Sequence, residues 1–342
     1  MTTAISKKIN EVNVLMTVFI VALHVFAWEE RMWFLRALVN MAVPVFFVIS
    51  SYLYFQNWTF SWQCYKKKIV RRLYSLYIPF IVYNALYIPY IFIKNNILQA
   101  ADTRHLSVFS IDMLTSIFIG LPDIPNLVLW FIRVLLVFSF VAPIIGLVIK
   151  YSKWAFVLIT MICFLLSPYF QYASILYWLP CLSLGTLLAF YESDMINFVN
   201  QLKHCVSRWV ILALFIAFMI IFSYILRNED VFTSPYYYYY RMAVPVFVIL
   251  IYSYFYHLLP TRFVSSILPY TFPIYCMQIP FVNFSVMFLS RLMPSQHFIV
   301  VQVLSFIIAF TLCLITCMLL SHIKPLWNIL TGFRNNHKKI MK

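Results

Sequence analysis

Charged residues are scarce in this chain of 342 residues, since only 10% are Asp, Glu, Lys or Arg while 64% are hydrophobic. Glycine is rarer still, with 4 residues. A soluble domain carries about a quarter charged residues, and a disordered chain has few apolar ones, so both classes are excluded. Long apolar blocks run from end to end. The sequence therefore predicts an all-α, polytopic membrane helical bundle, because a membrane β-barrel would show short alternating segments.

Motifs for metals, nucleotides and disulfides are also missing. The 7 cysteines form no CxxC pair, and most of them lie within apolar blocks. There is no Walker loop, no GxGxxG pattern and no HExxH pattern. We therefore predict neither a disulfide framework nor a metal site.

The net charge of +15 raises the question of a nucleic-acid partner. The basic residues, however, form short runs beside apolar blocks, as anionic headgroups and the positive-inside rule require. Membrane lipids are the expected partner of these charges, and no nucleic acid is predicted.

Charged or polar breaks divide the chain into about ten predicted spans of roughly 17–25 residues each. They are 12–28, 38–56, 73–93, 126–149, 154–171, 174–191, 209–226, 238–258, 265–289 and 298–322. The segment 106–121 is apolar but short and contains Asp112, so we expect an interfacial or re-entrant helix there. Basic loops on one side predict that both termini are cytoplasmic. The whole chain, 1–342, reads as one membrane domain with cytoplasmic tails at 1–11 and 325–342.

His24 stands about halfway along the first apolar stretch. An ionisable residue inside a spanning helix costs free energy on insertion, so it is a functional candidate by default. A buried neutral histidine accepts a proton from a hydroxyl, and we predict His24 to be a general base or proton shuttle. The competing interpretation is a histidine that only packs inside the bundle.

Arg133 and Gln278 fall at a depth similar to that of His24, counting about 1.5 Å of rise per residue. We predict that the three side chains line one catalytic cavity. Arg133 would hold an oxyanion or a phosphate there; alternatively, it extends to the nearer membrane surface.

A basic cluster immediately precedes the third predicted span, in the sequence KKKIVRR. Its simplest interpretation is an anchor for anionic headgroups. The second interpretation is a phosphate site for a nucleotide-type donor, held by Lys68, Arg71 and Arg72.

Several motifs occur together, in order, in one family. The chain resembles the acyltransferase 3 family of bacterial multi-pass membrane O-acyltransferases. The first span resembles the family's first helix with its functional histidine, and the motifs VPVFFVISSYLYF, YKKKIVRRLYSLYIPFIVYN, LVLWFIRVLLVFSFVAPII and LPYTFPIYCMQIP resemble its later helices. In these motifs the corresponding positions are His24, Ser50, Asn84, Trp130, Arg133 and Gln278.

This resemblance implies an acyl-CoA donor, most often acetyl-CoA, and a hydroxyl of a surface or lipid-linked saccharide as the acceptor. It implies a multi-pass protein of the bacterial inner membrane, and we leave a homo-oligomer open. The implied roles are catalysis for His24, Arg133 and Gln278, donor binding for Lys68, Arg71 and Arg72, and substrate binding for Ser50, Trp130 and Asn84.

The chain departs from the family pattern at three positions. Asn13 stands where a basic residue often precedes the histidine by eleven positions, Ser51 replaces a glycine, and Gln278 replaces a late histidine. Two alternatives therefore stay open beside the enzyme. One is a glycolipid or polysaccharide transporter, and the other is an inactive member that serves as a partner subunit.

Overall fold

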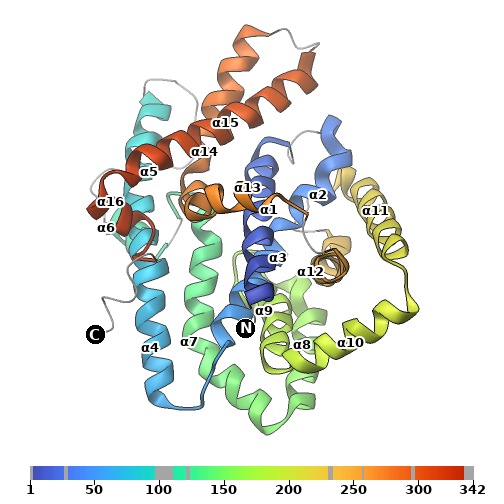
Figure 1. The fold of residues 1–342 in the computed structure, drawn as a ribbon. Helices are drawn as coiled ribbons and strands as arrows, with labels where there is room; N and C mark the ends of the chain where they lie inside the picture. Colours follow the sequence, from blue (N-terminus) through green and yellow to red (C-terminus); the bar gives the residue numbers. More distant parts are fainter. Residues whose placement is uncertain are drawn as a thin grey trace.

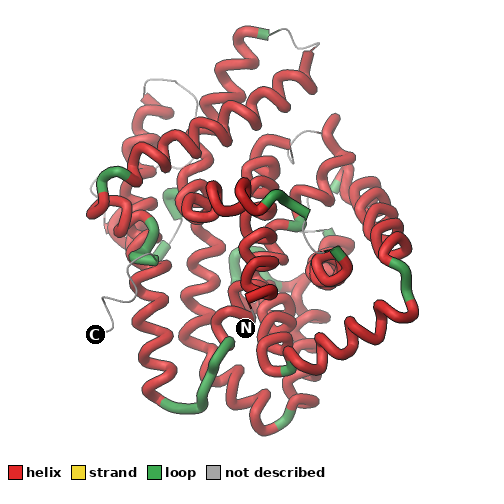
Figure 2. The backbone as a smooth tube through the Cα atoms, in the orientation of Figure 1, coloured by secondary structure: helices red, strands yellow, loops and turns green. Residues whose placement is uncertain are grey.

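A computed structural model describes residues 3–26, 30–96, 111–120, 124–229, 234–255, 258–293 and 297–334. Every regular element in these ranges is helical, and no strand occurs among them (Figure 2). The all-α prediction is confirmed for this part of the chain. The predicted tail 1–11 is largely inside the first helix, whereas residues 335–342 lie outside the described residues.

The helices follow one another along the chain with short connections. The first half contains α1 Thr3–Phe26, α2 Arg36–Asn40, α3 Ala42–Phe55, α4 Trp62–Arg72, α5 Ile78–Asn96, α6 Ile111–Phe118, α7 Trp130–Tyr151 and α8 Lys153–Leu166. The second half contains α9 Ile175–Phe190, α10 Glu192–Cys205, α11 Arg208–Ile225, α12 Pro235–Tyr254, α13 Thr261–Ile267, α14 Thr271–Leu292, α15 Phe298–Ser321 and α16 Lys324–Leu330. Short 3-10 or π segments connect several of them.

Seven helical stretches in the described residues are long and apolar enough to cross a membrane, or eight if α9 and α10 count as one bent span. The chain is therefore a multi-pass membrane protein by length and composition. Each of the ten predicted spans overlaps at least one helix of the described residues, but the count of ten and the side of the termini are not confirmed. The stretch 153–169 is too short to cross a membrane, and α12 is less apolar than the seven spanning stretches.

Part of the predicted interfacial segment 106–121 lies outside the described residues. The described part contains α6, a helix of 8 residues with Asp112 in its first turn. It packs against α5 (Figure 1).

The crossing of α3 and α9 brings two helix backbones very close together. Ser51 on α3 is fully buried, and its hydroxyl donates to the carbonyls of Phe47 and Val48 in its own helix. A Cβ atom at Gly185 on α9 would lie 2.1 Å from both the Ser51 Oγ and the Val48 carbonyl oxygen. The crossing thus requires a small residue at Gly185 on α9, opposite Ser51 of α3.

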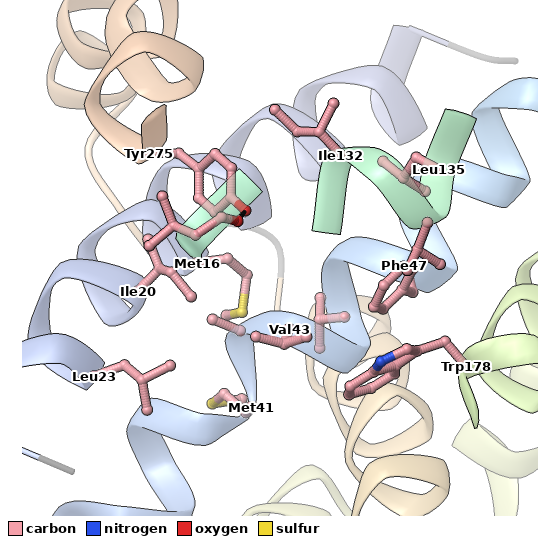
Figure 3. Packing of buried hydrophobic residues seen from close by; sticks show 14 of the residues in the cluster. Met16, Ile20, Leu23, Met41, Val43, Phe47, Ile132, Leu135, Trp178 and Tyr275 are labelled. Atoms are coloured by element: carbon pink, nitrogen blue, oxygen red, sulfur yellow. Dashed lines mark hydrogen bonds between the residues drawn. The ribbon is translucent and has the colours of Figure 1, made fainter. Parts of the chain in front are cut away.

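Large apolar side chains fill the space between α1, α3, α7, α9 and α14. Figure 3 shows Met16, Ile20 and Leu23 of α1 facing Val43 of α3, with Tyr275 of α14 beside Ile20. The rings of Phe47 and Trp178 stack at 4.6 Å between centroids. These contacts place α1 at the centre of the packing and hold the neighbouring helices at fixed positions around it.

The end of the described chain folds back onto the bundle. Helix α16 packs against α5, and Gly332 after it has a φ of +64°. A Cβ atom there would lie 2.6 Å from the Cα of Ser75. Glycine therefore satisfies both the left-handed backbone and the close approach, which brings Arg334 to the region where α4 joins α5.

Candidate active site

His24 lies near the end of α1 and lines a small cavity of about 50 Å³. A cavity of this size has room for a few water molecules or for a group the size of an acetyl. Among the residues that the structure describes, none forms a hydrogen bond with His24. Its imidazole is thus available to a ligand in the cavity.

The walls of this cavity come from four separate parts of the chain. They are Ile20 and Leu23 of α1, Val43 and Phe46 of α3, Val128, Trp130 and Phe131 at the start of α7, and Tyr275 of α14. Ile20, Leu23, Val43 and Tyr275 are seen together in Figure 3. Apart from His24 and the polar ends of Trp130 and Tyr275, the lining is hydrocarbon or aromatic. Such an environment excludes bulk water and strengthens electrostatic interactions within it.

Aromatic contacts fix the orientation of Trp130. Its ring stacks on Trp178 at 5.7 Å and meets Tyr172 edge-on at 5.4 Å. The Trp178 indole N–H in turn donates to the Tyr172 carbonyl oxygen at 2.6 Å. Trp130 is therefore held as a rigid wall of the cavity.

Tyr275 and Gln278 lie one turn apart on α14. The Tyr275 hydroxyl donates to the carbonyl of Val128, which ties α14 to the segment before α7. Gln278 is fully buried, and neither its amide nitrogen nor its carbonyl oxygen has a hydrogen-bond partner among the described residues. Burying such groups unpaired costs about 1–3 kcal/mol each, so Gln278 is a good candidate for a functional role.

Arg133 points toward the segment that follows α6. Its Nη1 donates to the Gly120 carbonyl oxygen at 2.7 Å. Gly120 has a φ of +77°, a conformation that glycine adopts without strain. Arg133 does not line the His24 cavity, although Trp130 and Phe131, less than a turn away, do.

Asn84 belongs to a buried polar network. Its Oδ1 accepts the Asn126 backbone N–H at 3.2 Å, and its Nδ2 donates to the Ile117 carbonyl at 3.4 Å. Asn126 donates its own amide to the Cys276 carbonyl at 2.7 Å. The network joins α5, α6, α14 and the entry to α7, which holds the cavity walls in register.

The basic cluster lies on α4, where Lys68 and Arg72 are one turn apart. Lys68 Nζ donates to the carbonyls of Tyr54 and Gln56 at 2.5 and 2.9 Å. Arg72 Nη2 donates to the Ser50 carbonyl at 3.2 Å, and its guanidinium lies 5.3 Å from the centre of the Tyr54 ring. Arg71 is exposed. The end of α3 therefore positions Lys68 and Arg72, whereas the exposed Arg71 side chain is free to rotate.

Arg334 joins this cluster from the other end of the sequence. Its guanidinium lies 3.7 Å from the centre of the Phe272 ring and interacts electrostatically with Arg71 and Arg72. Many protein atoms surround its partly accessible side chain, so desolvation lowers its pKa to about 10, and the nearby Arg72 adds to the shift. It remains charged at neutral pH. The cluster thus includes a cation that the KKKIVRR sequence does not supply.

A comparison with known protein families matches nearly the whole chain. The family model Acyl_transf_3, described as an acyltransferase domain, matches residues 13–321. The chain belongs to the acyltransferase 3 family. No curated protein and no solved structure matches it. The chain is thus a membrane acyltransferase by family, and the matched region contains His24 and most of the basic cluster but ends before Arg334.

The predicted site residues of this acyltransferase 3 member fall into three groups. His24 and Trp130 meet in one cavity. Lys68, Arg71, Arg72 and the Ser50 carbonyl meet at the end of α3. The remaining three residues do not line the cavity, and none of their hydrogen bonds is to a residue of the cluster; they are Arg133, Gln278 and Asn84. Their roles stay predictions.

Sequence reasoning missed Tyr275 and Arg334. Tyr275 stands in the quoted motif FPIYCMQIP, three residues before Gln278, so helical spacing could have indicated it. Arg334 is far from any other candidate in the sequence, and only the fold of the chain after α15 brings it to Arg72. Within the described residues, no group of His, Cys, Asp and Glu side chains could hold a metal ion.

Proposed function

We propose that this acyltransferase 3 member transfers an acyl group, most simply acetyl, from acyl-CoA to a hydroxyl of a surface or lipid-linked saccharide. His24 is the general base. The hydroxyl oxygen attacks the thioester carbonyl, the C–S bond breaks, and the hydroxyl proton passes through His24 to the departing thiolate.

The observation that carries this proposal is the placement of His24. Its imidazole has no hydrogen-bond partner among the described residues and lines a cavity with room for an acetyl group. A histidine kept only for packing would be expected to satisfy its ring nitrogens within the protein. The rigid Trp130 and Tyr275 walls support positioning of the thioester against the imidazole, which is the main contribution a protein makes to transfer from an already activated donor.

The basic cluster supports a nucleotide-type donor. Lys68, Arg71, Arg72 and Arg334 gather several positive charges, and phosphate groups are their natural partners. The tie between Arg72 and the Ser50 carbonyl places this charge at one end of α3, while Val43 near the other end of α3 lines the His24 cavity. A donor with its phosphates at the cluster would extend along α3 toward the imidazole.

The assignment is tested with membrane vesicles that contain the protein and the cell's own glycans. Radiolabelled acetyl-CoA is added on the side of the basic cluster, and label in the glycan fraction is counted. The expected result is transfer by the wild type and a loss of at least a hundredfold with His24→Ala. Label that accumulates equally with both proteins, or glycan that moves across the membrane without label, would count against the enzyme and for the transporter.

A further inference from the structure

A second, larger pocket lies away from the His24 cavity. It measures about 480 Å³ and is bounded by α1, α3, α9, α10 and α12. On α1 it is lined by Ile5, Lys8, Ile9 and Val12, and it shares no lining residue with the His24 cavity. The α1 residues that line this pocket end at Val12, whereas those of the His24 cavity begin at Ile20, so the two pockets are separated along that helix by about 12 Å.

The pocket is polar at one end and apolar along its depth. Val45, Val48, Pro245 and Val248 line the interior, about 6–10 Å along their helices from Tyr52 and Tyr252. Lys8, Glu192 and Lys203 lie at the end of the bundle where α1 begins. This polarity gradient fits a molecule with a charged head and a hydrocarbon chain.

Helix α10 forms the lid of the polar end. It turns by 91° from the direction of α9, as Figure 1 shows near the lower end of the bundle. Glu192, Ile196, Val199 and Lys203 lie on the face of α10 that lines the pocket, at helical spacing. A helix with this pattern that lies across the ends of spanning helices is typical of the membrane interface.

The charges at the polar end are unequally engaged. Glu192 accepts a hydrogen bond from the Tyr52 hydroxyl at 3.0 Å. Lys8 donates to the Tyr252 carbonyl and is repelled by Lys203, which lies 6.0 Å from the centre of the Tyr254 ring. Lys8 and Lys203 thus lie close enough to repel one another, and Glu11 attracts Lys8. Both nearby carboxylates already accept hydrogen bonds, Glu192 from the Tyr52 hydroxyl and Glu11 from the backbone N–H groups of Leu258 and Leu259.

We propose that this pocket binds one anionic phospholipid from the surrounding leaflet. One acyl chain fills the space between α3 and α12, and the phosphate lies between Lys8 and Lys203. The phosphate relieves the repulsion of the two ammonium groups, and the lipid is held at the interface by α10. The site stands independently of the proposed reaction, because it uses neither His24 nor the basic cluster on α4.

The test is native mass spectrometry of the full chain, released from detergent after titration with dioleoyl phosphatidylglycerol or dioleoyl phosphatidylcholine. The wild type is expected to retain one phosphatidylglycerol with at least tenfold higher affinity than phosphatidylcholine. Ile249→Trp fills the apolar part of the pocket and is expected to reduce phosphatidylglycerol affinity at least tenfold. Val246→Trp is the matched control, because Val246 is 42% exposed on the same helix and does not line the pocket.

A charge variant keeps the test decisive if Ile249→Trp does not fold. Lys203 is exposed, so Lys203→Gln should fold normally and remove the preference for phosphatidylglycerol over phosphatidylcholine. Lys153→Gln, a change at another exposed lysine outside the pocket, should leave that preference intact. Any of three results would overturn the proposal. They are equal affinity of the wild type for the two lipids, an unchanged preference for phosphatidylglycerol in Lys203→Gln, and retention of a different amphiphile.

Discussion

Gly185→Ala is expected to destabilise the bundle strongly for the addition of one methyl group. The new Cβ would lie 2.1 Å from the Ser51 Oγ, 2.1 Å from the Val48 carbonyl oxygen and 2.9 Å from the Val48 carbonyl carbon. Two of these atoms belong to the backbone of α3, so no rotation of a side chain relieves the contact. The two helices must separate by about 1 Å or more to restore an ordinary separation of about 3.5 Å.

The expected loss of stability can be estimated from the close packing of α3 against α9. Overpacking by one methyl in a well-packed interior costs about 1–3 kcal/mol, and rigid backbone neighbours favour the upper end. The gain in helix propensity from glycine to alanine offsets up to about 1 kcal/mol. We expect a net loss of about 2 kcal/mol, together with weaker packing of Phe47 against Trp178 on the same two helices.

Gly146→Ala is the matched control, because it adds the same methyl to a helix interior. Its Cβ would meet the Trp58 Nε1 at 3.2 Å and the Phe55 and Phe60 rings at 3.5 Å, all of them side-chain atoms that can shift. We expect the unfolding free energy of this variant in detergent to stay within about 1 kcal/mol of the wild type. Both variants are compared by reversible unfolding followed by tryptophan fluorescence.

A third variant separates the backbone clash from the hydroxyl clash. Ser51→Gly combined with Gly185→Ala removes the Oγ contact but leaves the Val48 carbonyl at 2.1 Å. The double variant should therefore recover little of the lost stability. Full recovery, or equal stability of Gly185→Ala and Gly146→Ala, would refute a close backbone approach of α3 and α9.

Three further predictions follow from single contacts. Arg334→Gln should raise the KM for acetyl-CoA several-fold while changing kcat less, since Arg334 adds to the cation cluster around Arg72; steady-state kinetics with an unchanged KM would remove Arg334 from the donor site. Asn126→Ala should lower the free energy of unfolding by about 2 kcal/mol, because it leaves the buried Cys276 carbonyl without its donor; thermal unfolding like that of the wild type would contradict this. Glu11→Ala should cost about 3 kcal/mol and Glu11→Gln less, because Oε1 accepts the backbone N–H groups of Leu258 and Leu259 at 2.5 and 2.7 Å; equal losses in the two variants would rule out a role for that acceptor oxygen.

The helical bundle could be predicted from the sequence because long apolar blocks leave few alternatives. The ends of the helices followed from charged breaks, so that the fourth predicted span, 126–149, coincides closely with the helical stretch Leu127–Tyr151. The bend between α9 and α10 could not be predicted from the sequence, since Glu192 and Asp194 mark a polar break but do not indicate the angle between the two helices. Angles between helices depend on packing partners that lie far apart in the sequence.

The candidate site could be predicted only where one residue type is unusual in its surroundings. His24 stood out as an ionisable residue in an apolar helix, and it does line a cavity. Arg133 stood out for the same reason, but Gly120 supplies it with a nearby carbonyl that depth along a helix cannot reveal. Arg334 was given no role from the sequence because it is far along the chain from the basic cluster, whereas the close approach of Gly332 to Ser75 in the fold brings it there.

The most direct test of the account is the O-acetyl content of surface glycans, measured by NMR. Cells carrying the wild type are compared with a deletion and with His24→Ala expressed at matched level. The account predicts that the acetyl signal disappears in both the deletion and His24→Ala, while the variant protein is still inserted in the membrane at the wild-type amount. An acetyl signal that persists with His24→Ala would contradict the central claim that transfer proceeds through this histidine.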